Sequence, residues 1–396
     1  DVAGNAMVAA GRTIPTGKNL ADEVVDIFVD GVLPVDDGTD ITMSSKGGNV
    51  VAGIYNDTNT SVDFVVSLVT TDGTLTGGTI QMVAKIEPNG WTNIGGAYTI
   101  KTADVTAGQA TVNVLSAPIE ALTSFATDGV IKIKATVTDK AGNSNDWAES
   151  ANTLTIDVTA PTIASASSTS NAGVYKATDN INVTLGFSEA VTMYNDDLDI
   201  ILNTSAILEL ASGTISNVTT KSATYTVAVG EETPDIAEIS SATLAVSQVK
   251  TTGGELRDQS GNPMVLPVTN IPVTIADDKA ISVDGVAPTA LTVDKVIATG
   301  NTVRHKYWNA VNTGVEIKVP LTDTDKTLID GQVRIKAKLS NSGTWDYIGN
   351  WSTITSAELT AKVKVMTLIA ADIAAYTGAD ANIIEFTAGV QDKAGN

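Results

Sequence analysis

The sequence predicts an all-β protein made of tandem antiparallel β-sandwiches, and three observations support this fold class. Short runs alternate apolar and polar residues, helical periodicity is almost missing, and one phrase recurs at a fixed interval. The phrase reads IFVDGVLP at 27–34, LTIDVTAP at 154–161 and ISVDGVAP at 281–288. Its aspartates, Asp30, Asp157 and Asp284, are 127 residues apart each time. The chain is therefore a series of repeated modules.

The text between these phrases distinguishes two kinds of module. In type A, GGTIQMVAKIEPNGWTNIGGAYTI after Asp30 is echoed by DGQVRIKAKLSNSGTWDYIGNWSTI after Asp284. Type B has a different text, with GVYKATDNINVTLGFSEAVTM and GGELRDQSGNPM, and its closing portion matches the start of the chain. We predict four segments: the C-terminal part of a truncated B module at 1–30, an A module at 31–157, a B module at 158–284, and an A module without its last strand at 285–396.

Each module is predicted to contain about seven short strands. Residues 80–86, 131–137, 181–187 and 224–229 alternate with period two, which places one set of side chains on a buried face. Segments 116–126 and 368–378 are the exceptions, where one helical turn is expected between two strands. Seven short strands in about 127 residues favour an immunoglobulin-like sandwich, and a closed barrel explains the repetition less well. Proline shortly after each repeated aspartate shortens the join, so we expect an elongated array with restricted hinges.

Composition excludes several kinds of partner. The 396 residues carry a formal net charge of -21 with a pI near 4.3, so nucleic acid and anionic membranes would be repelled. No run of about 18 apolar residues exists, which argues against membrane insertion. Cysteine is absent, so there is neither a disulfide framework nor a thiolate metal site. The chain starts with Asp, and we expect it to be a window of a longer protein; strand donation between subunits is the alternative.

The sequence also argues against an enzyme. Without cysteine there is no thiol nucleophile, and with His305 as the one histidine only a single imidazole-based triad could be built. No phosphate-binding glycine loop, G-x-S-x-G elbow or zinc-type spacing is present. The conspicuous acids repeat between modules, whereas catalytic acids should be unique. We interpret His305 as a surface or strand residue, and Trp91 and Trp345, which recur at one module position, as packing residues.

A second phrase, Asp-x-x-Gly-Asn with small variations, recurs in every module. It reads VTDKAGN around Asp139, VQDKAGN around Asp392, RDQSGN around Asp258 and DVAGN at Asp1. Asp can accept hydrogen bonds from the following backbone, Gly supplies a positive φ, and Asn tolerates the left-handed region. The phrase is therefore predicted to form a tight turn.

Together these phrases resemble known repeats. VTDKAGN followed by TLTIDVTAP resembles the bacterial Ig-like repeats of large secreted adhesins, and GVYKATDNINVTLGFSEAV with LRDQSGNPM resembles a second repeat of giant bacterial surface proteins. The resemblance implies an extracellular location on a bacterium or archaeon, with calcium at acidic positions near module junctions. It pairs Asp139 with Asp157, Asp258 with Asp284 and Asp1 with Asp30, and it leaves Asp392 without a partner. The ligands preferred by calcium are such carboxylate oxygens.

The function we predict is mechanical. Tandem modules, short joins, high negative charge and no catalytic groups suit a calcium-stiffened stalk or filament of a giant surface protein. Two alternatives remain: a surface-layer or sheath subunit that assembles with copies of itself, and a ligand- or carbohydrate-binding adhesin module. The expected partners are neighbouring modules, other copies of the chain, cell-surface glycans or another cell.

Overall fold

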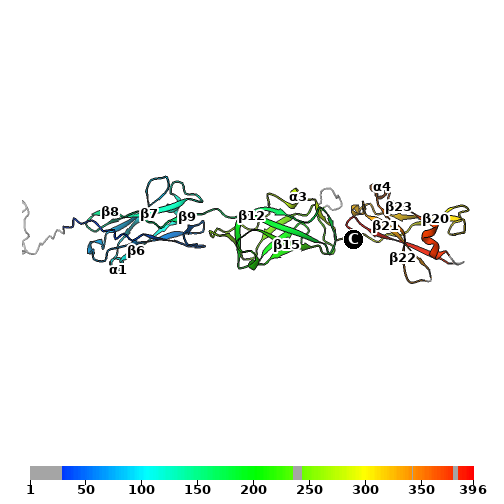
Figure 1. The fold of residues 1–396 in the computed structure, drawn as a ribbon, viewed down its shortest axis with the longest axis horizontal. Helices are drawn as coiled ribbons and strands as arrows, with labels where there is room; N and C mark the ends of the chain where they lie inside the picture. Colours follow the sequence, from blue (N-terminus) through cyan, green and yellow to red (C-terminus); the bar gives the residue numbers. More distant parts are fainter. Residues whose placement is uncertain (1–28, 235–242, 341, 378–381) are drawn as a thin grey trace, which may run out of the picture. The chain divides into compact units, whose positions relative to one another are not determined.

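The computed structural model describes residues 29–234, 243–340, 342–377 and 382–396, in which β-strands predominate (Figure 1). The chain divides into two compact units, Asp1–Val158 and Thr159–Asn396. The all-β fold class predicted from the sequence is confirmed. The predicted segment 1–30 lies outside the described residues except for its last two positions, and none of the described helices is long and apolar enough to cross a membrane.

The first unit packs two sheets around one core. The smaller sheet has the order β1-β3-β6, and the larger has the order β2-β9-β7-β4-β5 with β8 also paired to β7. The strands are β1 (Thr42–Lys46), β2 (Ile54–Tyr55), β3 (Ser61–Ser67), β4 (Thr79–Ile86), β5 (Thr92–Thr99), β6 (Gln109–Leu115), β7 (Val130–Thr138), β8 (Ser144–Asp146) and β9 (Leu154–Ile156). Short helices α1 (Thr102–Ala107) and α2 (Ser116–Glu120) flank β6, and the turn η2 (Gly73–Leu75) precedes β4.

The second unit contains two separate cores, and the first of these is formed by three sheets between residues 163 and 283. The sheet order is β10-β12-β15 with β17 on β12, beside β14-β13-β16 and the parallel pair β11-β18. The elements are β10 (Ile163–Ser167), β11 (Gly173–Tyr175), β12 (Asn180–Tyr194), β13 (Leu198–Leu202), β14 (Ile207–Leu210), η3 (Ser212–Thr214), β15 (Val218–Thr226), β16 (Val246–Lys250), β17 (Glu255–Asp258), α3 (Ile275–Asp278) and β18 (Ile281–Val283).

The remaining core of the second unit repeats the plan of the first unit. Its sheets are β19-β20-β23 and β22-β21-β24. The elements are β19 (Lys295–Gly300), β20 (Asn312–Pro320), η5 (Lys326–Leu328), β21 (Gln332–Leu339), β22 (Asp346–Thr353), α4 (Ser356–Thr360), β23 (Val363–Ile369), η6 (Ala370–Tyr376) and β24 (Ile384–Gln391). The register agrees too, since Thr79 pairs with Thr138 in β4-β7 and Gln332 pairs with Gln391 in β21-β24.

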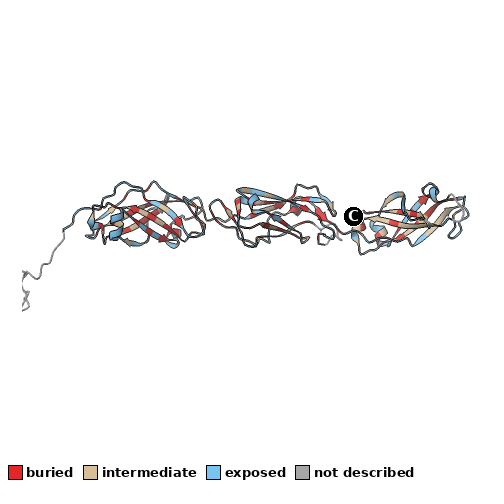
Figure 2. Ribbon diagram, turned by 90° about the horizontal axis from the view of Figure 1, so that it is seen from below, coloured by how far each residue is buried: buried red, intermediate tan, exposed pale blue. Residues whose placement is uncertain are grey.

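Burial follows the predicted alternation. In β7 every second residue is buried, and this set, Ile131, Ile133, Ala135 and Val137, is at most 2% exposed. Figure 2 shows the same alternation along other strands. Three hydrophobic clusters result, and we call them the first, second and third cores: Ile41–Ile156, Ile163–Val283 and Leu291–Ala388. The predicted helical segments contain α2 and η6, and β15 ends at Thr226 rather than 229.

Candidate metal centre

The Asp-x-x-Gly-Asn phrase forms the predicted turn. Asp392 Oδ1 accepts hydrogen bonds from the backbone N–H groups of Gly395 (2.8 Å) and Asn396 (3.0 Å), and Asn396 Nδ2 donates to Asp392 Oδ2 at 2.9 Å. Asp139 with Asn143, and Asp258 with Asn262, make the equivalent contacts. The glycine φ angles are +98° at 142, +94° at 261 and +86° at 395, so each turn needs the left-handed region.

In two of these turns, the closing asparagine also contacts a repeated linker aspartate. Asn143 Nδ2 donates to the backbone carbonyl of Asp30 at 3.2 Å, and Asn396 Nδ2 donates to that of Asp284 at 2.6 Å. The aspartate that precedes an A module therefore lies at the turn that follows β7 or β24 of that same module. Asp392 does have a linker partner, Asp284, contrary to the expectation that it would have none.

The predicted pairing of Asp139 with Asp157 was wrong, for a reason that lies in strand direction. Strand β9 pairs with the beginning of β7, with Ile131 opposite Leu154, whereas Asp139 follows the end of β7 at Thr138. At about 3.3 Å per residue, the two ends of this strand are roughly 25 Å apart. Asp139 and Asp157 thus lie at opposite ends of the module.

Asp284 is the most unusual carboxylate among the described residues. It is 1% exposed, its Oδ1 accepts one hydrogen bond from the backbone N–H of Val286 at 3.2 Å, and its Oδ2 is buried with no hydrogen-bond partner. Its pairing with Asp258, implied by the resemblance, was wrong as well, because its acidic neighbours are Asp392, Asp325 and Glu232. Burial, assisted by the negative charge of these three, raises the pKa of Asp284 to about 7.

The neighbours of Asp284 come from separate elements. Asp392 is 3% exposed and follows β24, Asp325 caps η5 by accepting from the backbone N–H of Thr327 at 3.1 Å, and Glu232 forms a β-bridge with Asp284 itself. The sequence reasoning missed Asp325 and Glu232. A signal for the former existed, because Asp325-Lys-Thr and Asp72-Gly-Thr occupy the same position in the two A modules and both cap a short turn.

Asp30 repeats the Asp284 arrangement in the first unit. Its Oδ1 accepts from the backbone N–H of Val32 at 3.0 Å, and its Oδ2 is buried without a partner. A solvent-open hollow at this position is lined by Val29, Asp30, Gly73, Thr74, Lys140 and Ala141. Asp1, the predicted partner of Asp30, lies outside the described residues.

Asp139 shows how a satisfied carboxylate differs from these two. Burial by itself raises its pKa, but hydrogen bonds from the Asn143 side chain and from the backbone N–H groups of Asn143 and Gly142 hold the pKa below its usual value. A buried carboxylate with several donors is thus stable as an anion. Asp284 and Asp30 each have an oxygen with no such donor.

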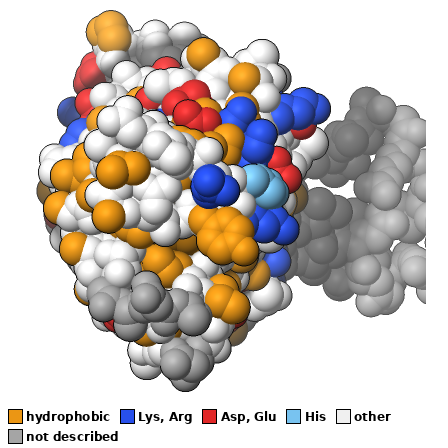
Figure 3. Space-filling model, turned by 90° about the vertical axis from the view of Figure 1, so that its right-hand side faces the viewer, with side chains coloured by type: hydrophobic (Ala, Val, Ile, Leu, Met, Phe, Trp, Pro, Cys, Tyr) orange, Lys and Arg blue, Asp and Glu red, His pale blue; other side chains and the backbone are white. Residues whose placement is uncertain are grey.

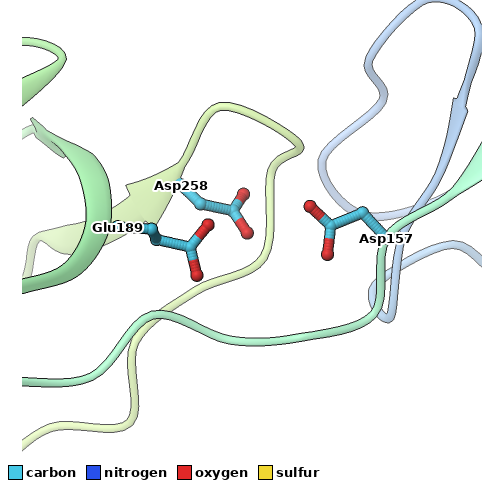
Figure 4. A group of neighbouring side chains, drawn as sticks. All are labelled: Asp157, Glu189 and Asp258. Atoms are coloured by element: carbon cyan, nitrogen blue, oxygen red, sulfur yellow. The ribbon is translucent and has the colours of Figure 1, made fainter. Parts of the chain in front are cut away.

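Two further acids of the second unit, Glu189 and Asp258, bring their ligand atoms within 4.8 Å of each other, and Figure 4 labels both. Glu189 belongs to β12 and Asp258 ends β17, whereas Asp157 follows β9 of the first unit. Glu189, in the phrase GFSEAV, was not among the predicted site residues. Each of these side chains offers the hard carboxylate oxygens that calcium prefers.

His305 is exposed together with its neighbours Arg304, Lys306 and Tyr307. Figure 3 shows the histidine at the surface among Lys and Arg side chains. The structure therefore presents it as a surface residue.

The chain matches no protein-family model and no curated protein.

Proposed function

We propose that this chain is a non-enzymatic structural repeat region of a large extracellular surface protein of a bacterium or archaeon, in which calcium stiffens the joints between successive immunoglobulin-like sandwiches. The observation that carries the proposal is the Asp284 carboxylate, buried with one oxygen unpartnered and with three further acids around it. Supporting features are the 127-residue repeat, the net charge of -21 and the resemblance to adhesin repeats.

The electrostatics favour a cation over an empty acidic group. Burying an unpaired carboxylate is strongly unfavourable, and negative neighbours increase the penalty. Calcium accepts six to eight oxygen ligands from carboxylates, carbonyls and water, and does not require rigid geometry. Asp284, Asp392, Asp325 and Glu232 supply carboxylates from separate loops, which is the kind of ligand set that calcium accepts.

The same ligands explain how calcium would affect stiffness. Glu232 and Asp284 border the second core, whereas Asp325 and Asp392 belong to the elements of the third core. A cation that binds all four connects the two cores through one centre. Without it the acids repel one another, and the joint loses an ordering force.

Calorimetric titration of the chain with CaCl₂ tests the centre directly. We expect saturable binding that Asp392→Asn weakens at least tenfold and that Asp323→Asn, a control at an acid paired with Lys362 at 2.9 Å, leaves unchanged. Small-angle scattering in calcium and then in chelator should show increased flexibility after chelation. Equal binding by both variants, or identical scattering curves, refutes the proposal. Sheets or tubes formed by the purified protein would support the surface-layer alternative.

A further inference from the structure

The outward face of strands β21 and β22 carries a continuous group of aromatic and cationic side chains. Along β21 the side chains of Arg334, Lys336 and Lys338 alternate with the buried Val333, Ile335 and Ala337, so the three cations share one face. Trp345, Tyr347 and Trp351 come from β22 and the residue preceding it. We call these six residues the aromatic face: Arg334, Lys336, Lys338, Trp345, Tyr347 and Trp351.

The contacts within the aromatic face are close. Lys338 Nζ lies 4.8 Å from the Trp345 ring centroid, and Lys336 Nζ and Arg334 Cζ lie 4.6 and 5.3 Å from that of Tyr347. The ring centroids of Tyr347 and Trp351 are 5.4 Å apart. Trp345 and Tyr347 nevertheless remain 39% and 43% exposed. A contiguous exposed patch of this kind marks an interaction surface more often than an isolated exposed aromatic residue does.

The equivalent sheet of the first unit shows which of these residues the fold itself does not require. Matching the strand registers places Gln81 and Val83 where the third core has Arg334 and Lys336. Asn93 and Ala97 correspond to Tyr347 and Trp351. The two sheets share their strand order and a bulge with a positive-φ glycine, at Gly95 and Gly349. The added aromatic and cationic residues are thus specific to the third core.

The two sheets also differ at Gly389 of β24, because the first unit has Thr136 at the equivalent position of β7. A Cβ added at Gly389 would lie 2.6 Å from the hydroxyl oxygen and 2.7 Å from Cε1 of Tyr347. The Tyr347 side chain therefore extends across β21 and covers this position on β24. The glycine permits the ring to lie against the sheet, which leaves its outer side open to a ligand.

The charges of the aromatic face are only partly used within the protein. In the first unit, Lys85, Lys132 and Lys134 pair with Glu87, Glu149 and Asp146 at 2.7–2.9 Å. In the third core, Lys338 pairs with Glu385 at 3.2 Å, but no carboxylate of the described ranges forms an ion pair with Arg334 or Lys336. Two cations beside exposed rings, in a chain of net charge -21, form a local site for an anion.

We propose that the aromatic face binds an acidic polysaccharide, a function beyond the structural role proposed above. Sugar rings present C–H groups that pack flat on an aromatic ring, and an acidic sugar carries its carboxylate on the same ring. One residue of the polymer can therefore contact Tyr347 and an adjacent cation together. Successive cations on β21 are about 6.6 Å apart along the strand. Duplex nucleic acid, with one charge per about 1.7 Å, would be repelled most strongly by the rest of the chain.

The test measures binding of the whole chain to sodium alginate, a polyuronate, by calorimetry in EDTA, so that the calcium centre is not involved. Arg334→Gln with Lys336→Val, and separately Tyr347→Asn with Trp351→Ala, introduce the residues that the first unit carries. We expect each pair to weaken binding at least tenfold and higher salt to weaken wild-type binding. Lys134→Gln, beside Trp91 in the first unit, is the matched control and should change affinity less than twofold.

Thermal unfolding confirms that each variant is folded before binding is compared. The proposal is overturned if wild type does not bind alginate, if both double variants bind alginate as tightly as wild type does, or if wild type binds neutral dextran as tightly as alginate. Tighter binding of poly-glutamate than of alginate overturns it in favour of an acidic peptide. Because all measurements are made in EDTA, failure here leaves the calcium proposal intact, and failure of calcium binding leaves this result intact.

Discussion

Asp284→Asn is predicted to stabilise the metal-free protein at neutral and alkaline pH. The substitution keeps Oδ1, which accepts from Val286, and removes the buried charge on the unpartnered Oδ2. In the folded protein, burial and the neighbouring acids raise the carboxyl pKa from 3.8 to about 7. A difference of about 3 pKa units at 1.36 kcal/mol each corresponds to roughly 4 kcal/mol.

The sign follows from proton linkage. Because the folded-state pKa is raised, the wild type has its full stability below pH ~4 and loses stability as pH rises through the folded value of about 7. In chelator, the variant should therefore resemble wild type near pH 4 and exceed it by up to ~4 kcal/mol at pH 8. In calcium this difference should shrink, because wild type gains about 2.7 kcal/mol at a free calcium concentration of one hundred times Kd, and about 4.1 kcal/mol at one thousand times Kd, where the two proteins become equally stable.

Hydrogen exchange provides a local measurement. Peptides that cover β18 and the turn at 392–396 should exchange more slowly in the variant than in wild type at pH 8 with EDTA, after correction for intrinsic rates, and this difference should shrink as calcium is added. Asp323→Asn is the control, since that carboxylate is partly exposed and paired with Lys362. A variant that is less protected than wild type in EDTA at pH 8 would show that the Asp284 charge is not an unfavourable one.

Three further substitutions test the packing of the sheets. Glu358→Gln removes the carboxylate 2.8 Å from the buried Lys364 Nζ and should lower the free energy of unfolding by about 3 kcal/mol in urea titrations followed by tryptophan fluorescence. Burial acts to raise the pKa of Glu358, but hydrogen bonds from Lys364 and Thr355 lower it overall. The stabilisation by the Glu358–Lys364 pair should therefore vanish as pH falls through the lowered pKa of Glu358. A loss of stability in Glu358→Gln that does not depend on pH would contradict this role of the pair. Tyr55→Phe removes the 2.8 Å hydrogen bond to Glu120 and should lower the melting temperature through a loss of about 1 kcal/mol, whereas no change would show the bond to be neutral. Gly331→Ala places a Cβ 2.5 Å from a backbone carbonyl oxygen of β24. This substitution should lower the free energy of unfolding by about 2 kcal/mol and weaken calcium binding. Gly343→Ala is its control, because the space around Gly343 is open.

Local interactions account for what could be predicted. Period-two alternation identified β4, β7 and the start of β12, because a strand with one buried face places apolar and polar residues at alternate positions of the sequence. The turns at Asp139, Asp258 and Asp392 were predictable for the same reason, since their hydrogen bonds join residues no more than four apart. The residue types that can form such turns are few.

Contacts between distant segments could not be read in this way. Whether Asp139 lies beside Asp30 or Asp157 depends on the direction of β7, because a strand carries its two ends to opposite sides of the module. The burial of Asp284 and its proximity to Glu232 and Asp325 arise from three separate loops. The repeated aspartates were visible in the sequence, but their partners were not.

By itself, the sequence determined that this protein is a repeated β protein with acidic, glycine-bearing turns at regular intervals. The tertiary structure alone decided which acids share a site, which of them lack a hydrogen-bond donor, and that one sheet presents an aromatic face that its counterpart lacks. The physical reason is range: alternation and turns depend on residues within a few positions, whereas the energy of a buried charge depends on every group that folding brings near it.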